Sequence, residues 1–280
     1  MATPEHNTED KSTRFWFITW VYLALLVILS FVPTPALKEA PTNTDKVLHF
    51  VGYFFFTYFF LLGTGFKARP FALVLAAALA FLTESVQDLL PWRDASLLDA
   101  AAGIAGAGLA VLIPKSVGKR LLAWFSTLFF VGYLPKAPGT WATGITLLVL
   151  FFAPVSSPVI LIMALPLALL AFWSSDYAVS LWGPDPGKVV IDEALGATLS
   201  VALLPKTGMV YLLAFFLFRL FDIWKPPPVR QLDSMESTSS VVLDDVAAGI
   251  MANLVIWALM LWTPLKQVSL QDVIRFFLQG

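Results

Sequence analysis

The sequence predicts an all-α, polytopic integral membrane protein built from two helical modules. Of its 280 residues, 58% are hydrophobic and 13% are charged, and the mean hydropathy is +0.79, which lies outside the range of soluble domains. The apolar residues form stretches that are long enough, or nearly long enough, to cross a bilayer, and short polar connections separate them. We therefore expect a four-helix module followed by a multi-helix module with some short or re-entrant helices.

The first module is expected over residues 15–115. A polar tail, residues 1–14, precedes it, and the apolar run after this tail lacks a small-residue cleavage site, so we expect a retained helix rather than a signal peptide. The predicted apolar segments are Phe15 to Val32, Val47 to Gly65, Phe71 to Val86 and Leu97 to Ile113. A basic linker, residues 116–120, ends the module.

The second module is expected over residues 121–264, with an amphipathic C-terminal tail at 265–280. Its apolar segments are Leu121 to Val131, Thr140 to Ala153, Val159 to Ser174, Ala194 to Leu204, Gly208 to Phe221 and Val246 to Trp262. Several are too short to span alone. We expect Leu121 to Leu134 and Ala194 to Leu204 to be interfacial or re-entrant, which requires that other protein covers their backbone.

Positive charges indicate the orientation of the chain. Seven of them flank the first helix's start and the ends of helices two and four, whereas three lie in the opposite loops, which favours a cytoplasmic N-terminus. The seven are Lys11, Arg14, Lys67, Arg69, Lys115, Lys119 and Arg120, and the three are Lys38, Lys46 and Arg93.

Charge and cysteine content exclude several classes of function. The net charge is -1 and the basic residues are scattered, so we expect no nucleic-acid partner. The chain has no cysteine, which excludes disulfides, a thiolate nucleophile and thiolate metal ligands.

Six polar residues of the first module are predicted to lie at one membrane face, which the charge count makes extracytoplasmic. They are Asp45, His49, Glu84, Gln87, Arg93 and Asp99. Because residues three or four apart share a helix side, these side chains are able to converge on one pocket. The alternative is that Arg93 pairs with Asp99 or Glu84 and that the polar set caps helix ends.

The motifs D-K-x-x-H, E-x-x-Q and P-x-R-x-x-S-x-x-D, followed by a helix of small residues, lie within residues 15–115. With these motifs the module resembles the VanZ-like family. The resemblance implies a small integral membrane domain, associated in some members with glycopeptide resistance. We hypothesise that it binds a lipid or cell-wall precursor.

Four carboxylate groups stand at the ends of apolar stretches in the second half of the chain. They are Asp176, Asp192 with Glu193, Asp222, and Asp244 with Asp245. A carboxylate costs roughly 2.5 to 3.5 kcal/mol at the bilayer centre, and acids drawn into one layer repel each other unless cations hold them. This layer therefore predicts a divalent metal site, although for Asp176 a topological role is favoured.

Basic and loop residues accompany these acids. Oxygen ligands suit Mg²⁺ and leave coordination sites for water and phosphoryl oxygens, and Arg219 and Lys225 are suited to bind the remaining phosphate charge. Before Thr140, two prolines and a glycine set a turn at a helix start, where backbone N–H groups attract anions. Metal ions acidify water, and a spare carboxylate can accept its proton. Hydrolysis of a phosphate monoester follows as the expected reaction.

Other phosphatase mechanisms fit the sequence poorly. A histidine-based lipid phosphatase needs a nucleophilic histidine, but the two histidines are His6, in the polar tail, and His49, in the first module. An aspartyl-phosphate route usually begins at D-x-D, and Asp222 lacks the second acid.

The blocks P-x-A-P-G-T, D-E, F-R-x-F-D-x-x-K-P and D-D-x-x-A-G occur in this order between residues 121 and 262. In this order and spacing they resemble the phosphatidylglycerophosphatase A family. The resemblance implies Mg²⁺-dependent conversion of phosphatidylglycerol phosphate to phosphatidylglycerol. It assigns metal and catalytic roles to Asp192, Glu193, Asp222, Asp244 and Asp245, and substrate contacts to Thr140, Arg219 and Lys225. The charge count predicts that this site faces the cytoplasm, and we expect the chain in a bacterial inner membrane. A membrane binding or transport protein that holds a cation or headgroup without turnover is the alternative.

Overall fold

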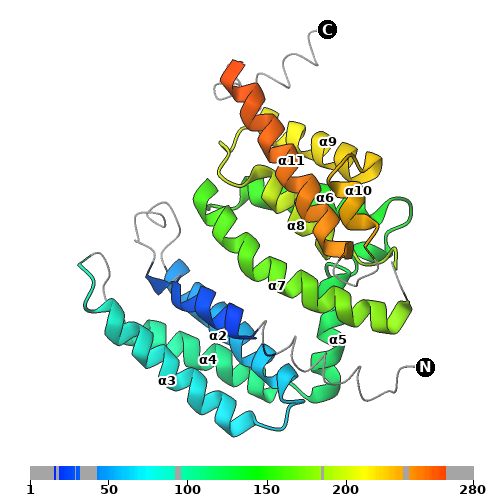
Figure 1. Cartoon of the computed structure of the whole chain (residues 1–280). Helices are drawn as coiled ribbons and strands as arrows, with labels where there is room; N and C mark the ends of the chain where they lie inside the picture. The colour runs from blue at the N-terminus through cyan, green and yellow to red at the C-terminus, as the bar shows by residue number, and fades with distance from the viewer. Residues whose placement is uncertain are drawn as a thin grey trace. The chain divides into compact units, whose positions relative to one another are not determined.

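In the computed structural model (Figure 1), every regular element of the described residues is helical, which confirms the all-α prediction. The described residues are 16, 19–28, 30–31, 43–91, 96–183, 186–235 and 240–262. A helix at Thr19–Ile28 comes first. The later elements are α2 (Thr44–Gly63), α3 (Arg69–Gln87), α4 (Leu97–Leu112), α5 (Lys115–Ser126), η2 (Val131–Tyr133), α6 (Pro138–Phe152), α7 (Ser157–Trp182), α8 (Ile191–Val201), α9 (Gly208–Trp224), α10 (Val229–Asp233) and α11 (Ser240–Trp262).

Four of the described helices are long and apolar enough to cross a membrane: α2, α3, α7 and α11. This confirms a polytopic membrane protein. The 11-residue α8 is far shorter than the roughly 20 residues that a spanning helix needs. The predicted polar N-terminal tail and amphipathic C-terminal tail lie outside the described residues.

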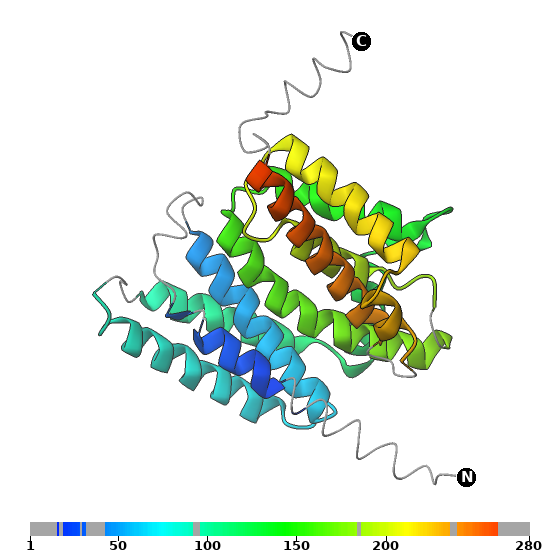
Figure 2. The same ribbon diagram turned by 45° about the horizontal axis from the view of Figure 1, so that its top comes forward.

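The chain divides into two compact units, Met1–Arg120 and Leu121–Gly280. In the first unit, α4 packs against both α2 and α3 (Figure 2). Small residues on α4 permit this approach, because a Cβ on Gly103 would come within 2.7 Å of the Tyr53 ring and one on Gly106 would collide with the Phe50 carbonyl. The Tyr53 hydroxyl then bonds the Thr83 hydroxyl of α3 at 2.9 Å.

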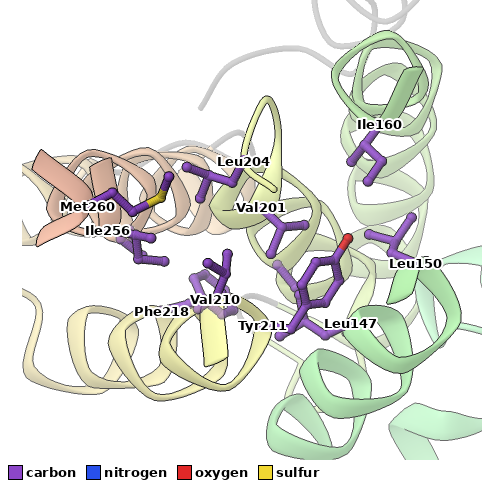
Figure 3. Packing of buried hydrophobic residues seen from close by; sticks show 14 of the residues in the cluster. Leu147, Leu150, Ile160, Val201, Leu204, Val210, Tyr211, Phe218, Ile256 and Met260 are labelled. Atoms are coloured by element: carbon purple, nitrogen blue, oxygen red, sulfur yellow. The ribbon is translucent and has the colours of Figure 1, made fainter. Parts of the chain in front are cut away.

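The second unit has an apolar core to which α6, α7, α8, α9 and α11 all contribute (Figure 3). Phe218 of α9 and Ile256 of α11 are fully buried in it. Packing of such side chains holds the helices together through van der Waals contacts, because lipid provides no hydrophobic driving force between helices. Because Phe218 immediately precedes Arg219, the core fixes the orientation of the charged end of α9.

Helices α8 and α11 cross at two glycines. A Cβ on Gly249 would collide with the carbonyl of Gly196, and a Cβ on Gly196 would collide with the Phe218 ring and approach the Asp245 carbonyl to 2.7 Å. Gly196 lies four residues after Asp192, and Gly249 lies four residues after Asp245. Since residues four apart share a helix side, this crossing brings the acids of the two helices together.

Helices α7 and α11 extend beyond the predicted apolar segments in a way that changes where acids lie. The segment expected to end at Ser174 continues as α7 to Trp182, because apolar residues persist until Gly183, whose φ of 90° ends the helix. Asp176 therefore lies inside this helix. The last helix begins at Ser240, so Asp244 and Asp245 lie about one turn inside it.

Candidate functional site

The five predicted acids of the second unit are supplied by three helices. Asp192 and Glu193 occupy the first turn of α8, where a carboxylate interacts favourably with the helix dipole. Asp222 lies in the last turn of α9, and Asp244 and Asp245 follow the start of α11. Segments more than 50 residues apart in the sequence thus contribute to one site.

Three of these acids form a compact cluster, which we call the acid cluster: Asp192, Glu193 and Asp245. Each offers one carboxylate oxygen, and these oxygens all lie within 4.8 Å of one another. Asp192 and Asp245 are 4% and 5% exposed. Burial of like charges at this separation is unfavourable unless a cation or a proton compensates.

The pKa values of the α8 acids reflect this environment. Burial raises the pKa of Asp192 to about 6. Burial, followed by repulsion from Asp192 and Asp245, raises the pKa of Glu193 well above its usual value. A nearby positive charge is therefore needed to stabilise the ionised form of these carboxylates.

Arg219 joins Asp222 to the acid cluster. Its Nη1 donates a hydrogen bond to Asp222 Oδ2, one helical turn away on α9, and the same nitrogen lies 4.0 Å from Glu193 Oε1. The Nε of Arg219 is buried and has no acceptor among the described residues. A guanidinium held in this way retains a donor for an additional anion.

Lys225 contacts carboxylates on two elements. This residue caps the C-terminus of α9 with a φ of 49°, and its Nζ donates to Asp233 at the end of α10 and to Asp244 Oδ2 at 3.0 Å. Burial opposes its charge, but these two bonds raise the pKa of Lys225. Lys225 thus stabilises the charge of Asp244.

Asp233 was missed by the sequence analysis. It belongs to the five-residue helix α10 and follows Lys225 by eight residues, but Lys225 caps a different helix, so the spacing within one helix does not predict the contact. Asp233 lies between the F-R-x-F-D-x-x-K-P and D-D-x-x-A-G blocks and belongs to neither, so only the packing of α10 against α11 reveals the contact.

We expect Lys225→Gln to lower kcat/KM for phosphate release about 10-fold or more, and Asp233→Asn to change it less than about fivefold. Asp233 is 45% exposed, and exposed ion pairs contribute about 0–1 kcal/mol. Asp244 is 9% exposed, and hydrogen bonds to buried charges contribute about 1.5–3 kcal/mol. Steady-state kinetics of both variants test the difference, and equal losses would contradict it.

The first turn of α6 approaches the acid cluster through Gly139. Lys136 and Ala137 have φ values of 58° and 53°, an unfavourable conformation for residues with a side chain, and they turn the chain into Pro138. A Cβ on Gly139 would collide with Glu193 Oε1 and come within 3.1 Å of Arg219 Nη1. The helix begins at Pro138, so Thr140 lies in its first turn, next to the glycine that contacts the site.

The donor set fits a hard divalent cation. Glu193 Oε2, Asp244 Oδ1 and Asp245 Oδ1 are buried and accept no hydrogen bond from the described residues. Unpaired buried oxygens are rare in native proteins and indicate a missing partner. All the candidate ligands are carboxylates, which suit Mg²⁺.

Some of the six polar residues predicted at one membrane face of the first unit also lie close to one another. His49 Nε2 lies 3.2 Å from Glu84 Oε1, and Lys46, which the sequence analysis treated as a topological charge, lies 3.2 Å from Asp45 and 3.3 Å from Asp99. Gln87 is buried and donates to the carbonyl of Ser30 at 2.6 Å instead. Arg93 lies outside the described residues.

Comparison with known proteins supports the interpretation of the second unit. The family profile described as Phosphatidylglycerophosphatase A matches residues 124–260. A Haemophilus influenzae protein named phosphatidylglycerophosphatase A is 34% identical over 139 residues, covering 48% of this chain and 85% of that protein. The Escherichia coli protein of the same name is 33% identical over 70 residues, covering 24% of this chain and 41% of its own length.

A relative with a different name matches equally well. A Bacteroides thetaiotaomicron protein provisionally named as a phosphatidylinositol-3-phosphatase is 33% identical over 156 residues, covering 54% of this chain and 86% of that protein. No solved structure matches the chain. The family profile, the relatives and the helical, membrane-embedded fold agree: this chain belongs to the phosphatidylglycerophosphatase A family and is a membrane phosphatase.

Proposed function

We propose that the chain hydrolyses phosphatidylglycerol phosphate to phosphatidylglycerol and phosphate, with Mg²⁺ as cofactor, at the cytoplasmic face of a bacterial inner membrane. The observation that carries the proposal is that one site contains both carboxylate oxygens that require a cation and a guanidinium nitrogen that requires an anion. Among the described residues, no donor reaches one buried carboxylate oxygen on each of Glu193, Asp244 and Asp245, and no acceptor reaches the buried Nε of Arg219. A magnesium ion together with a phosphate monoester supplies both.

The roles of the residues follow from these contacts. Asp192, Glu193 and Asp245 would hold the metal, which supplies charge stabilisation for the phosphoryl oxygens and lowers the pKa of water. Arg219, oriented by Asp222, donates to a phosphate oxygen, and Gly139 leaves room beside it. Lys225 donates a hydrogen bond to Asp244 Oδ2, which favours the ionised form of that carboxyl, and Thr140 is the substrate contact proposed on the α6 side.

The net reaction adds water across the ester bond. The oxygen of water forms a bond to phosphorus while the bond from phosphorus to the lipid oxygen breaks, and the departing lipid oxygen receives a proton and becomes a hydroxyl group. A carboxylate of the five-acid set accepts the proton of the attacking water. Arg219 neutralises charge on the phosphoryl group, which favours the transition state if its contacts strengthen there.

The test is phosphate release by the purified full-length protein in detergent, from phosphatidylglycerol phosphate. We expect turnover with Mg²⁺, loss of turnover with a chelator, and recovery when excess Mg²⁺ is restored. Asp245→Asn is the control for contaminating phosphatases. Release that persists in the chelator at the full rate would contradict the metal assignment, and no release from folded protein would contradict the substrate.

Phosphatidylinositol 3-phosphate is the matched comparison substrate. Both lipids carry a phosphate monoester on a headgroup, and the two differently named relatives are similar to this chain to nearly the same extent. We expect kcat/KM to be higher for phosphatidylglycerol phosphate. A preference for the inositol lipid would retain the phosphatase chemistry and reassign the substrate.

We also propose that residues 15–115 form a VanZ-like domain, that 116–120 form a basic linker, and that 121–264 form the phosphatase domain. The division of the chain into compact units at Arg120 and Leu121 supports this proposal. The charge asymmetry supports a cytoplasmic phosphatase site and an outward VanZ-like polar set. A lipid or cell-wall precursor is the partner that we propose for that set.

A further inference from the structure

A second group of metal-ligating side chains lies in the first unit, outside the phosphatase site. His49 of α2, Glu84 of α3 and Asp99 of α4 each offer one ligand atom, and these atoms lie within 4.8 Å of one another. We call this group the histidine cluster. All three side chains are close to fully enclosed, with exposures of 11%, 7% and 8%.

The tautomer of His49 is set by its first hydrogen bond. Nδ1 lies 2.9 Å from the backbone carbonyl of Asp45, and because a carbonyl only accepts, Nδ1 carries the proton. In the neutral ring, Nε2 then carries a lone pair and no proton, and Nε2 lies 3.2 Å from Glu84 Oε1. Two acceptors that face each other repel unless a cation lies between them.

Each of the two carboxylates in the cluster also has one oxygen without a hydrogen-bond donor among the described residues. Glu84 Oε2 accepts from the backbone N–H of Ser96 at 2.8 Å, but Glu84 Oε1 and Asp99 Oδ1 are buried without a hydrogen-bond partner among the described residues. Lys46 Nζ is 3.3 Å from Asp99 Oδ1 but does not have the geometry of a hydrogen bond to it. As whole residues, Glu84 and Asp99 are only 5% and 6% exposed, so water does not supply hydrogen bonds to these oxygens.

The charges of the described residues leave a negative surplus. Asp45, Glu84 and Asp99 are three carboxylates, and Lys46 is the full positive charge that contacts them. An imidazole nitrogen with two carboxylate oxygens from three helices matches the three-ligand pattern of open transition-metal sites, in which second-shell contacts such as Nδ1–H to a carbonyl orient the histidine.

We propose that the histidine cluster binds a first-row divalent transition metal, with zinc as the preferred ion, through His49 Nε2, Glu84 and Asp99. Imidazole favours zinc over magnesium, which distinguishes this site from the all-carboxylate acid cluster. Three protein ligands leave a coordination position open for an anionic or hydroxyl-bearing ligand. The first unit is therefore a metal-dependent binding module, independent of whether the second unit hydrolyses phosphatidylglycerol phosphate.

The experiment measures zinc per chain by equilibrium dialysis and elemental analysis on the full-length protein carrying His6→Gln, which removes the other histidine. His49→Asn is the informative variant, because its amide nitrogen replaces the Nδ1 donor while Nε2 is lost. We expect His49→Asn and Glu84→Gln each to lose one bound zinc per chain. Asp88→Asn, an exposed acid just after α3, should retain it, and thermal unfolding checks that each variant is folded.

A second experiment tests directly whether the imidazole nitrogen of His49 binds the metal. In a chain carrying His6→Gln and Asp192→Asn, His49 is the remaining histidine and the acid cluster is weakened. Pulsed EPR of bound Mn²⁺ should show nitrogen modulation from one imidazole, and His49→Asn should abolish it. Equal zinc content in the His49→Asn chain, or no nitrogen signal in the parent, would overturn the proposal and leave the contact between His49 and Glu84 as a structural one.

Discussion

Asp245→Asn and Asp192→Asn are each expected to lower kcat/KM for phosphate release more than about 100-fold. Both carboxylates belong to the acid cluster, whose oxygens lie within 4.8 Å of one another. An amide keeps the side-chain size but removes the negative charge that a cation requires. Loss of groups that merely support metal ligands costs about 10–100-fold, so loss of a ligand should cost more. Phosphate release measured over a Mg²⁺ titration tests this.

The same variants should remain folded, because they remove repulsion between buried carboxylates. Melting temperatures at or above that of the parent are expected in the absence of metal. Asp176→Asn is the matched control, since Asp176 lies inside α7 and outside the acid cluster, and its activity should stay within about twofold. Full turnover in both Asp192→Asn and Asp245→Asn would reject the assignment of the metal site.

Gly249→Ala is the second substitution with a large expected effect. The new methyl group would collide with the Gly196 carbonyl, with the carbonyl carbon and Cα of Gly196 also at 2.9 and 3.0 Å, so α8 and α11 must separate. Overpacking of this kind costs about 1–3 kcal/mol. Displacement of a catalytic group by about 1 Å can cost about 100-fold in rate, and this separation moves Asp245 away from Asp192 and Glu193.

We expect Gly249→Ala to lower kcat about 100-fold and to weaken the activation by Mg²⁺, with a smaller loss of thermal stability. Gly144→Ala on α6 is the control, because a Cβ there meets only the Phe215 ring at 3.6 Å, an ordinary contact. Alanine at that position should leave activity unchanged and should not reduce stability. Normal activity of Gly249→Ala would show that the crossing of α8 and α11 does not set the geometry of the acids.

The sequence by itself determined the class of the protein and the types of residue at its site. Apolar segments separated by polar connections predict a helical membrane protein, because a backbone in lipid must satisfy its own hydrogen bonds. Paired acids near Arg219 and Lys225 predict a cation and an anion, because buried charges require partners. Both inferences depend on local composition, and the family relationship agrees with them.

The tertiary structure decided which acids meet and what the cations contact. Asp192, Glu193 and Asp245 meet because Gly196 and Gly249 let two helices approach, and the sequence does not say which glycines face each other. Lys225 contacts Asp233 and Asp244 because α10 packs against α11, a contact that no helical period encodes. Side-chain partners across helices depend on packing, which the order of residues along one helix does not contain.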